Sequence, residues 1–479
     1  MVKEIASMFI AREKELQSLE AVYAKNGFGM TIIYGRRRVG KSTLIREFVR
    51  DKEHVFYTAT KVGAVRNLEL FTRQVLEVIE PNMSEATFPT IEDVLNVITD
   101  YLRKSGDKLV LVIDELPYWA EKDEALLSIF QKYIDTKWQD SNMMLILCGS
   151  ALSFMENKVL SEKSPVFGRR DSQIKLDAFN YKDAALFVPN YSAEDKAICY
   201  GVTGGVAKYL ELFDTSLSLD DNIERLFFSP DGYLFDETKN LLTQEFADVT
   251  LVNNIIEQVA NGENTLNVIS SKVHEKDSTV LYSLDKLIDV GLVEKRKCIT
   301  EEKNKKKTQY VLRDHMFKFW YRFIANAISV IEMGQGRQYY DKVVKPRLHL
   351  YMGSVFEEMC RYYTLEQGIA GAYGPIITSV GTWWGVEHSV REDGTKYNET
   401  ADIDVVGVSS INKDVIVGEC KFTNDKIDKE VYDTLLRRSD LLTNRKVSAY
   451  LLFSLNGYTK WFDTEKLDDW YLYKLEDMY

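Results

Sequence analysis

The segment from residue 35 to residue 42 constrains this chain more than any other part of its sequence. It reads Gly-Arg-Arg-Arg-Val-Gly-Lys-Ser, a complete G-x-x-x-x-G-K-[ST] pattern. An apolar stretch, 30–34, precedes it, and a helix-like stretch, 44–48, follows it. A strand, a glycine turn and a helix N-terminus direct several backbone N–H groups to one point, where they can hold phosphate. The sequence therefore predicts an α/β fold whose sheet carries a triphosphate site.

The residues of this loop have distinct expected roles. Lys41 would reach the β- and γ-phosphates of ATP, and the Ser42 hydroxyl would hold Mg²⁺. The three arginines are ambiguous, because only the loop backbone has to touch phosphate. The alternative for the whole segment is a chance glycine turn. The predicted nucleotide-binding residues of the loop are Gly35, Arg36, Arg37, Arg38, Val39, Gly40, Lys41, Ser42 and Thr43.

A second apolar run, 109–113, ends in the acids Asp114 and Glu115. An unbroken apolar run is typical of a central parallel strand, and ligands bind at the C-terminal edge of such sheets. We expect Asp114 to hold Mg²⁺ through water and Glu115 to act as general base. The alternative is a plain helix N-cap.

Ser150 follows a third apolar run, 143–148. We expect it to sense the γ-phosphate, with a turn serine as the alternative. Further strands are predicted at 54–59 and 173–176. The helices between these strands give the alternation of a doubly wound α/β domain.

The bulk composition limits the other possibilities. A chain of 479 residues is too long for one core. Its net charge of −12 should repel nucleic acid, so any DNA contact needs local basic patches. The five cysteines are scattered, which argues against a zinc site or a disulfide framework. We expect a cytoplasmic protein, since no signal peptide is apparent and no apolar run approaches the ~18 residues of a membrane span.

Residues 249–313 carry apolar residues at helix spacing in three stretches, followed by a predicted hairpin. Three helices and a hairpin describe a winged helix-turn-helix. Between Glu294 and Arg313, eight cations face three carboxylates, a local charge of +5. The cations are Lys295, Arg296, Lys297, Lys303, Lys305, Lys306, Lys307 and Arg313. Such a wing suits contacts with DNA phosphates; solubilising lysines or a protein-docking role are the alternatives.

The last third of the chain holds a second chemical signal. Glu419 and Lys421 lie on one face of an otherwise apolar strand, where charges are costly without partners. Glu357 from a predicted helix and Asp404 from a strand would complete a metal-binding set. The alternative is a buried Glu–Lys ion pair.

This set resembles the PD-(D/E)XK nuclease pattern. The resemblance implies that Glu357, Asp404 and Glu419 hold Mg²⁺. It also implies that Asp404, Glu419 and Lys421 act in phosphodiester cleavage, with Lys421 orienting the nucleophile.

Four segments resemble the archaeal-type ATPases of the AAA+/STAND group. They are residues 9–16, the phosphate loop, residues 164–170 and residues 203–210, where Ala207 replaces the family's usual proline. In the third segment, Arg169 and Arg170 could contact phosphate or act as an arginine finger on a neighbouring subunit. The alternative is a pair of surface arginines.

The resemblance covers nearly the whole chain and implies four domains. These are a P-loop ATPase core at 1–178, a helical lid at 179–245, a winged helix at 246–320 and a restriction-endonuclease-like α/β domain at 321–479. The implied protein hydrolyses ATP, is directed to DNA and carries a metal-dependent nuclease-like domain, with ATP and Mg²⁺ as cofactors. It would form a homo-oligomer if an arginine finger operates. The alternative is a nucleotide-switched sensor or scaffold whose inactive nuclease-like domain binds a partner.

Overall fold

The computed structural model describes residues 9–301, 307–390, 396–443 and 445–479. The chain divides into two compact units. The first runs to Phe179 and includes Val206–Lys208; the second comprises Asn180–Gly205 and Tyr209–Tyr479. The first boundary lies next to the predicted end of the ATPase core. The three domains predicted after it fall within the second unit, except for Phe179 and Val206–Lys208 of the predicted lid, which belong to the first unit.

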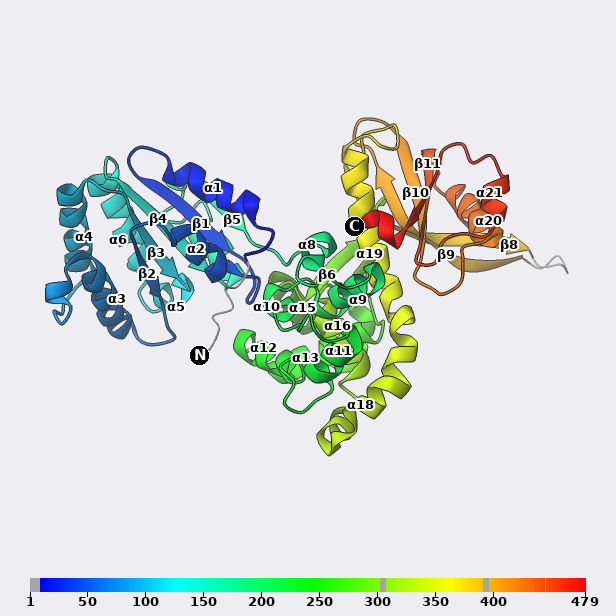
Figure 1. Cartoon of the computed structure of the whole chain (residues 1–479), viewed down its shortest axis with the longest axis horizontal. Helices are drawn as coiled ribbons and strands as arrows, with labels where there is room; N and C mark the ends of the chain where they lie inside the picture. The colour runs from blue at the N-terminus through cyan, green and yellow to red at the C-terminus, as the bar shows by residue number, and fades with distance from the viewer. Residues whose placement is uncertain (1–8, 302–306, 391–395, 444) are drawn as a thin grey trace. The chain divides into compact units, whose positions relative to one another are not determined.

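The first unit contains a five-stranded parallel sheet in the order β2-β3-β4-β1-β5 (Figure 1). All five predicted strands are present, which confirms the α/β fold. They are β1 (Gly29–Tyr34), β2 (His54–Thr58), β3 (Leu109–Asp114), β4 (Met143–Gly149) and β5 (Ser172–Lys175). Strands β1, β3 and β4 are buried along their whole length, as expected for unbroken apolar runs.

Helices cover both faces of this sheet, so alternate strand residues enter different cores. Ile33 and Val112 pack with α1 and α2, whereas Ile32 and Leu111 pack with α3, α4 and α6. The α-helices are α1 (Glu13–Tyr23), α2 (Lys41–Val49), α3 (Ala64–Ile79), α4 (Ile91–Ser105), α5 (Leu116–Ala120), α6 (Leu126–Tyr133) and α7 (Leu152–Phe154). Short helical turns are η1 (Pro81–Met83), η2 (Ile134–Trp138) and η3 (Met155–Val159).

The second unit begins with helices in the region predicted as a lid. They are α8 (Tyr181–Ala185), α9 (Ala193–Thr203), α10 (Ala207–Leu210, which starts in the first unit), α11 (Leu219–Phe227) and α12 (Glu237–Glu245). The predicted three helices and hairpin follow as α13 (Val249–Ala260), α14 (Leu266–Val273), α15 (Asp277–Asp289), β6 (Val293–Lys297) and β7 (Thr308–Leu312). The two strands pair antiparallel. We call residues 246–320 the helix–hairpin module.

A mixed five-stranded sheet forms the C-terminal part, in the order β12-β11-β10-β9-β8. Its strands are β8 (Ser379–Val390), β9 (Lys396–Val408), β10 (Asp414–Lys421), β11 (Lys446–Ser454) and β12 (Trp470–Lys474). The first three pair antiparallel, and β10, β11 and β12 are parallel. Helix α19 (Leu348–Ile369) packs along β8, β9 and β10, and α20 (Lys429–Ser439) packs on β9 and β10 (Figure 1).

The second unit contains further short helices. They are α16 (His315–Phe323), α17 (Ile328–Val330), η5 (Ile331–Gln335), α18 (Gly336–Tyr339), η6 (Tyr340–Val344), η7 (Lys345–Arg347), α21 (Trp461–Thr464) and η8 (Leu475–Met478). The aromatic segment that precedes the C-terminal part is therefore the buried helix α16.

The loop after β6 packs into the C-terminal sheet. Cys298 and Ile299 are buried in the same hydrophobic core as Trp383. The Ile299 backbone N–H donates to the Thr382 carbonyl of β8 at 3.1 Å, and Lys307 Nζ donates to the Trp384 carbonyl at 3.1 Å. The loop thus covers the edge strand of the sheet.

This packing limits how much of the predicted basic wing is available for contacts with DNA phosphates. The start of the loop belongs to the hydrophobic core, because Cys298 and Ile299 pack against Trp383 of β8. Lys295 pairs with Asp285 at 2.7 Å, Arg296 with Glu294 at 3.4 Å and Lys307 with Glu301 at 2.6 Å. Lys303, Lys305 and Lys306, also counted in the basic wing, lie outside the described residues. The described wing cations are therefore largely neutralised by their neighbours.

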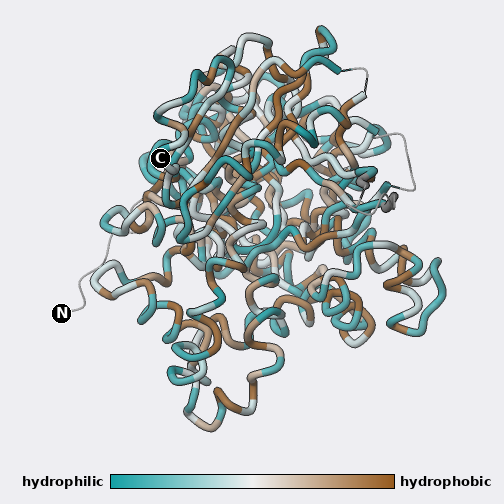
Figure 2. The backbone as a smooth tube through the Cα atoms, turned by 90° about the vertical axis from the view of Figure 1, so that its right-hand side faces the viewer, coloured by the Kyte–Doolittle hydropathy of each residue, from teal (hydrophilic) through white to brown (hydrophobic). Residues whose placement is uncertain are grey.

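No helix in the described ranges is long and apolar enough to cross a membrane. Figure 2 agrees, since hydrophobic and hydrophilic residues alternate along the tube in short stretches.

Replacing Ile299 with Asp should lower the free energy of unfolding of the second unit by about 3 kcal/mol. It removes a buried side chain and places a charge in the core. Urea unfolding followed by tryptophan fluorescence measures this, since Trp383 lies in the same core. Ile411→Asp is the matched control, because Ile411 is 73% exposed. Equal stability of the two variants would contradict the docking of the loop.

Candidate active sites

The phosphate loop lies between the end of β1 and the first turn of α2. Gly35 passes so close to β5 that a Cβ there would lie 2.1 Å from the Leu176 carbonyl oxygen. Gly40 caps α2 with φ +94°, a conformation that side chains disfavour. Both glycines of the motif are thus required by the backbone path. That path points the N-terminal N–H groups of α2 into the loop.

Lys41 and Ser42, the first two residues of α2, have the surroundings that the motif predicts. Lys41 is buried, and its Nζ donates to the carbonyls of Gly35 and Arg36 at 2.8 and 2.9 Å. The Ser42 hydroxyl donates to Asp114 Oδ2 at 2.7 Å. Asp114 is itself buried at the end of β3. The structure thus brings the two predicted magnesium ligands together.

Glu115 and Ser150 also meet, although they come from different strands. Glu115 Oε2 accepts hydrogen bonds from the Ser150 hydroxyl at 2.7 Å and from its backbone N–H at 3.2 Å. Glu115 has φ +52°, a strained value for a residue with a side chain. This backbone and the Ser150 bonds fix the direction of the predicted base. Ser150 therefore contacts Glu115, a role that the sequence did not suggest.

Two further contacts with the loop were missed by motif reading. Arg12 donates to the Asp177 carbonyl at 2.7 Å and to the Val39 carbonyl at 3.4 Å. The Lys208 backbone N–H donates to the Arg38 carbonyl at 3.1 Å. Both lie in segments singled out for their family resemblance, 9–16 and 203–210. Both segments therefore donate hydrogen bonds to backbone carbonyls of the phosphate loop.

The arginines predicted to meet phosphate have protein partners. Arg169 forms a two-pronged pair with Asp135, with Nε–Oδ1 at 2.7 Å and Nη2–Oδ2 at 2.6 Å. Arg170 lies over the Phe167 ring. Arg37 donates to the Tyr118 hydroxyl. An arginine-finger role for Arg169 stays a prediction, and it would require breaking the pair with Asp135.

A pocket of about 530 Å³ in the C-terminal part gathers the four side chains predicted for a nuclease. Glu357 comes from α19, Asp404 from β9, and Glu419 and Lys421 from β10. Arg438 of α20 also lines the pocket. Glu357 and Lys421 are 64 positions apart in the sequence, yet the helix and the two strands bring all four predicted side chains to one cavity.

The acids of this pocket are crowded. Asp404 Oδ2 accepts from the Cys420 backbone N–H at 3.0 Å, and burial, followed by the charges of Glu419 and Glu357, raises its pKa well above the ordinary value. Lys421 Nζ donates to Glu419 Oε1 at 2.7 Å. Burial opposes the charge on Lys421, but Glu419 outweighs this and raises its pKa. The buried Glu419 Oε2 has no hydrogen-bond partner.

These observations fit a divalent cation, which would neutralise the crowded carboxylates and give Glu419 Oε2 a partner. The arrangement is not a ready metal cage. In the part of the chain that the structure describes, no three His, Cys, Asp or Glu side chains are placed to hold a metal ion together. An ion would have to draw Glu419 away from Lys421.

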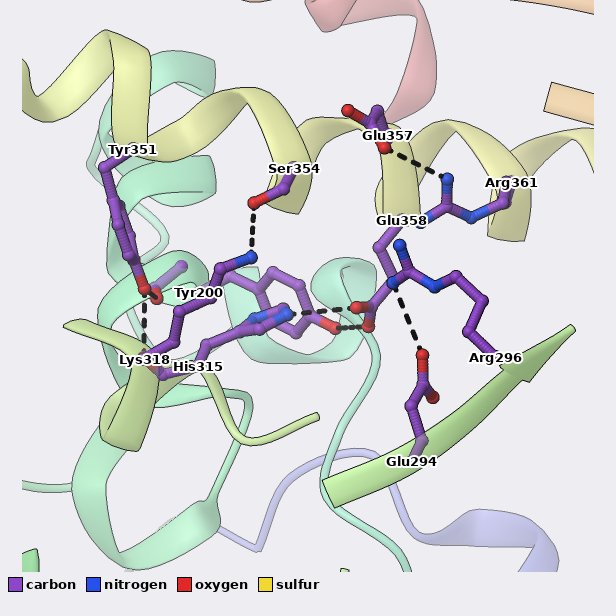
Figure 3. Close-up of polar contacts among 11 residues, drawn as sticks. Tyr200, Glu294, Arg296, His315, Lys318, Tyr351, Ser354, Glu357, Glu358 and Arg361 are labelled. Carbon is purple, nitrogen blue, oxygen red and sulfur yellow. Dashed lines mark hydrogen bonds and ion pairs between the residues drawn. The ribbon is translucent and has the colours of Figure 1, made fainter. Parts of the chain in front are cut away.

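Two residues of helix α19 that lie close to Glu357, namely Glu358 and Arg361, form polar contacts with other parts of the chain (Figure 3). Arg361 Nη1 donates to Glu357 at 3.3 Å and to the Asp404 carbonyl at 3.0 Å. Glu358 accepts from Tyr200 of α9 at 3.2 Å and lies 3.0 Å from His315 Nε2. Burial would raise the pKa of Glu358, but His315 and the neighbouring cations outweigh it and lower the pKa to about 2. Water screens part of this interaction, because the side chain is 44% exposed.

Residues 9–213 match a family described as an ATPase domain predominantly from Archaea. Over these residues the chain is similar to that family of ATPase domains. Residues 320–434 match a second family, of archaeal and bacterial proteins of unknown function. The resemblance to archaeal-type ATPases is thereby confirmed for the first part of the chain.

Individual proteins are also similar to this chain. An uncharacterized protein of Methanocaldococcus jannaschii is 29% identical over 98% of this chain and 100% of its own length. An uncharacterized ATP-binding protein of the same organism is 46% identical over 46 residues, 10% of this chain and 78% of that protein. A Walker-type ATPase of Pyrococcus abyssi shares the fold with a TM-score of 0.50 and 18% identity, over 66% of this chain and 96% of that one.

Gly35→Ala should weaken nucleotide binding by about 5- to 150-fold, because its Cβ would collide with a backbone carbonyl. Such overpacking costs about 1–3 kcal/mol, and about 1.4 kcal/mol corresponds to a factor of ten. Titration with a fluorescent ADP analogue measures the affinity. Gly63→Ala is the control, since Gly63 has φ −64° and a methyl group added there would meet no atom within 4 Å. Unchanged affinity in Gly35→Ala would exclude this loop as the phosphate site.

Proposed function

We propose that this protein binds and hydrolyses ATP at the phosphate loop and uses the nucleotide cycle to control a C-terminal nuclease-like domain that acts on DNA. The observation that carries the first part is the meeting of Ser42 with Asp114 and of Glu115 with Ser150 beside the loop. The family of residues 9–213 and the relative named as an ATP-binding protein support it.

The residues of the first site divide the chemistry among them. Lys41 would exchange the carbonyls of Gly35 and Arg36 for β- and γ-phosphate oxygens. Ser42 and Asp114 would hold Mg²⁺, which supplies positive charge against the phosphates. Glu115 would accept the proton of the attacking water, and Ser150 would keep its carboxylate in position. All these groups lie at strand ends or at one helix N-terminus, which fixes the backbone that carries them.

Glu115→Gln should slow ATP hydrolysis by about 10²–10³-fold and leave nucleotide binding nearly unchanged. The amide keeps the shape of the side chain but cannot accept the proton. Phosphate release measures the rate, and titration with a fluorescent nucleotide measures binding. Glu121→Gln is the control, because Glu121 is an exposed acid at the end of α5. Turnover at the wild-type rate in Glu115→Gln would show that another group is the base.

We propose further that residues 321–479 form a PD-(D/E)XK-type domain and that the helix–hairpin module is a winged helix. The order of elements supports the first assignment, since α19 is followed by three antiparallel strands, a helix and parallel strands. The common pocket of Glu357, Asp404, Glu419 and Lys421 supports it as well. In phosphodiester cleavage the three acids would hold Mg²⁺, and Lys421 would orient the attacking water.

One observation favours a second candidate function. Seven carboxylates line the pocket against three cations. Three described cations of the β6–β7 hairpin, Lys295, Arg296 and Lys307, are paired with carboxylates. This charge balance repels DNA unless a cation binds. It suits a nucleotide-switched scaffold whose nuclease-like domain binds a partner protein and cuts nothing.

A DNA cleavage assay with Mg²⁺ or Mn²⁺, with and without ATP, separates the two candidates. We expect cutting by the wild type and a loss of at least about 10²-fold in Glu419→Gln and in Lys421→Met, since each removes a group that acts on the nucleophile or the metal. Asp414→Asn, at the opposite end of β10, should cut normally. Cutting that survives both substitutions would place the site elsewhere. A wild type that cuts nothing with either metal would favour the scaffold.

A further inference from the structure

Helix α20 lines the C-terminal pocket with one face. Glu430, Thr434 and Arg438 follow one another at intervals of four residues, and all three border the cavity. Residues at this spacing share a side of a helix. Arg438 lies in the last turn and is the arginine among the lining residues. Nothing in the PD-(D/E)XK pattern of Asp404, Glu419 and Lys421 assigns it a role.

The guanidinium of Arg438 is anchored at one end. Nη1 donates to the carbonyl of Asp402 at 2.9 Å and to its carboxylate at 3.1 Å. Asp402 precedes Asp404 by two residues on β9, so the anchor and the predicted metal ligand share one strand. The Asp402 side chain is 67% exposed, and water weakens its hold on the cation. The two bonds to Asp402 therefore orient the Arg438 side chain, but they neutralise little of its positive charge.

The Nε–H group of the guanidinium lacks an acceptor. Arg438 Nε is buried and has no hydrogen-bond partner. A buried donor on a cation is costly to leave unpaired, and such atoms mark places where a ligand supplies the missing acceptor. Glu419 Oε2, also buried and unpaired, belongs to the same pocket. Two residues that line one pocket thus carry an unpaired donor and an unpaired acceptor, and a phosphate and a divalent cation are the groups that would pair with them.

The other cations of the pocket are less suited to this role. Lys421 is committed to Glu419 at 2.7 Å, and Lys426 is exposed at the rim. A guanidinium also matches the geometry of phosphate oxygens better than an ammonium does, because its N–H groups lie in one plane.

We propose that Arg438 binds a phosphate oxygen of a nucleic-acid strand in this pocket, beside the cation held by the acids. The proposal rests on the proposed nuclease-like function and names the group that holds its substrate. Arg438 does not take part in proton transfer; it positions the phosphodiester against Asp404 and Glu419. Because seven carboxylates surround the site, the phosphate should enter only together with a divalent cation.

Binding of the full-length protein to fluorescently labelled duplex DNA, measured by anisotropy with Ca²⁺ in place of Mg²⁺, tests this without relying on cleavage. We expect Arg438→Ala to weaken binding about tenfold, the worth of one charge-assisted phosphate contact, and to reduce the salt dependence by about one ion. Arg438→Lys should recover part of the affinity. Arg437→Ala is the matched control, since Arg437 is its neighbour in sequence but pairs with Glu387 and is 60% exposed.

A further variant and a competitor sharpen the result. Asp402→Asn keeps the shape of the anchor and should weaken binding less than Arg438→Ala, so it remains informative if Arg438→Ala folds poorly in a thermal melt. Inorganic phosphate should compete with DNA for the wild type and lose that effect in Arg438→Ala. Equal DNA affinity of the wild type, Arg438→Ala and Asp402→Asn would overturn the role of Arg438. A wild type that binds no DNA with Ca²⁺ would instead overturn the proposed DNA-directed function.

Discussion

The first unit depends on the parallel register of β1, β4 and β3. Tyr34 is paired with Gly149 and Ile113 with Leu147, so the three strands end level with one another. Because β4 lies between the other two, its last residues border both the phosphate loop and the acids after β3. Groups far apart in the sequence then meet within one hydrogen bond, as Ser42 does with Asp114. The chemistry of this unit follows from where its strands stop.

The local features of the fold could be predicted from the sequence. Unbroken apolar runs at 109–113 and 143–148 are enough to predict buried parallel strands. The glycines of the phosphate loop indicate a tight backbone turn, because glycine adopts conformations that other residues disfavour. The placement of Asp114 and Glu115 at the end of β3 follows from the first of the two apolar runs. The C-terminal set of Glu357, Asp404, Glu419 and Lys421 was also found from residue types and strand alternation, and the structure places all four in one pocket.

Other contacts could not be predicted, because they depend on pairing between distant segments. The bond of Ser150 to Glu115 and the pair of Arg169 with Asp135 join side chains whose separation in space no periodicity encodes. The net charge of +5 between Glu294 and Arg313 can be counted from the sequence. That count does not show that Cys298 and Ile299 enter a core formed with Trp383. A run of lysines around two apolar residues looks like a surface loop until its partner strand is known.

The docking of that loop on β8 affects whether the C-terminal sheet would stay soluble on its own. An uncovered edge strand offers unpaired N–H and C=O groups to any other strand, which promotes association between chains. Here Ile299 caps that edge from within the same polypeptide. A fragment that begins after the helix–hairpin module would expose both the edge and the hydrophobic residues around Trp383. The sheet is therefore a poor candidate for separate expression, and its solubility depends on a loop that precedes it in the chain by about eighty residues.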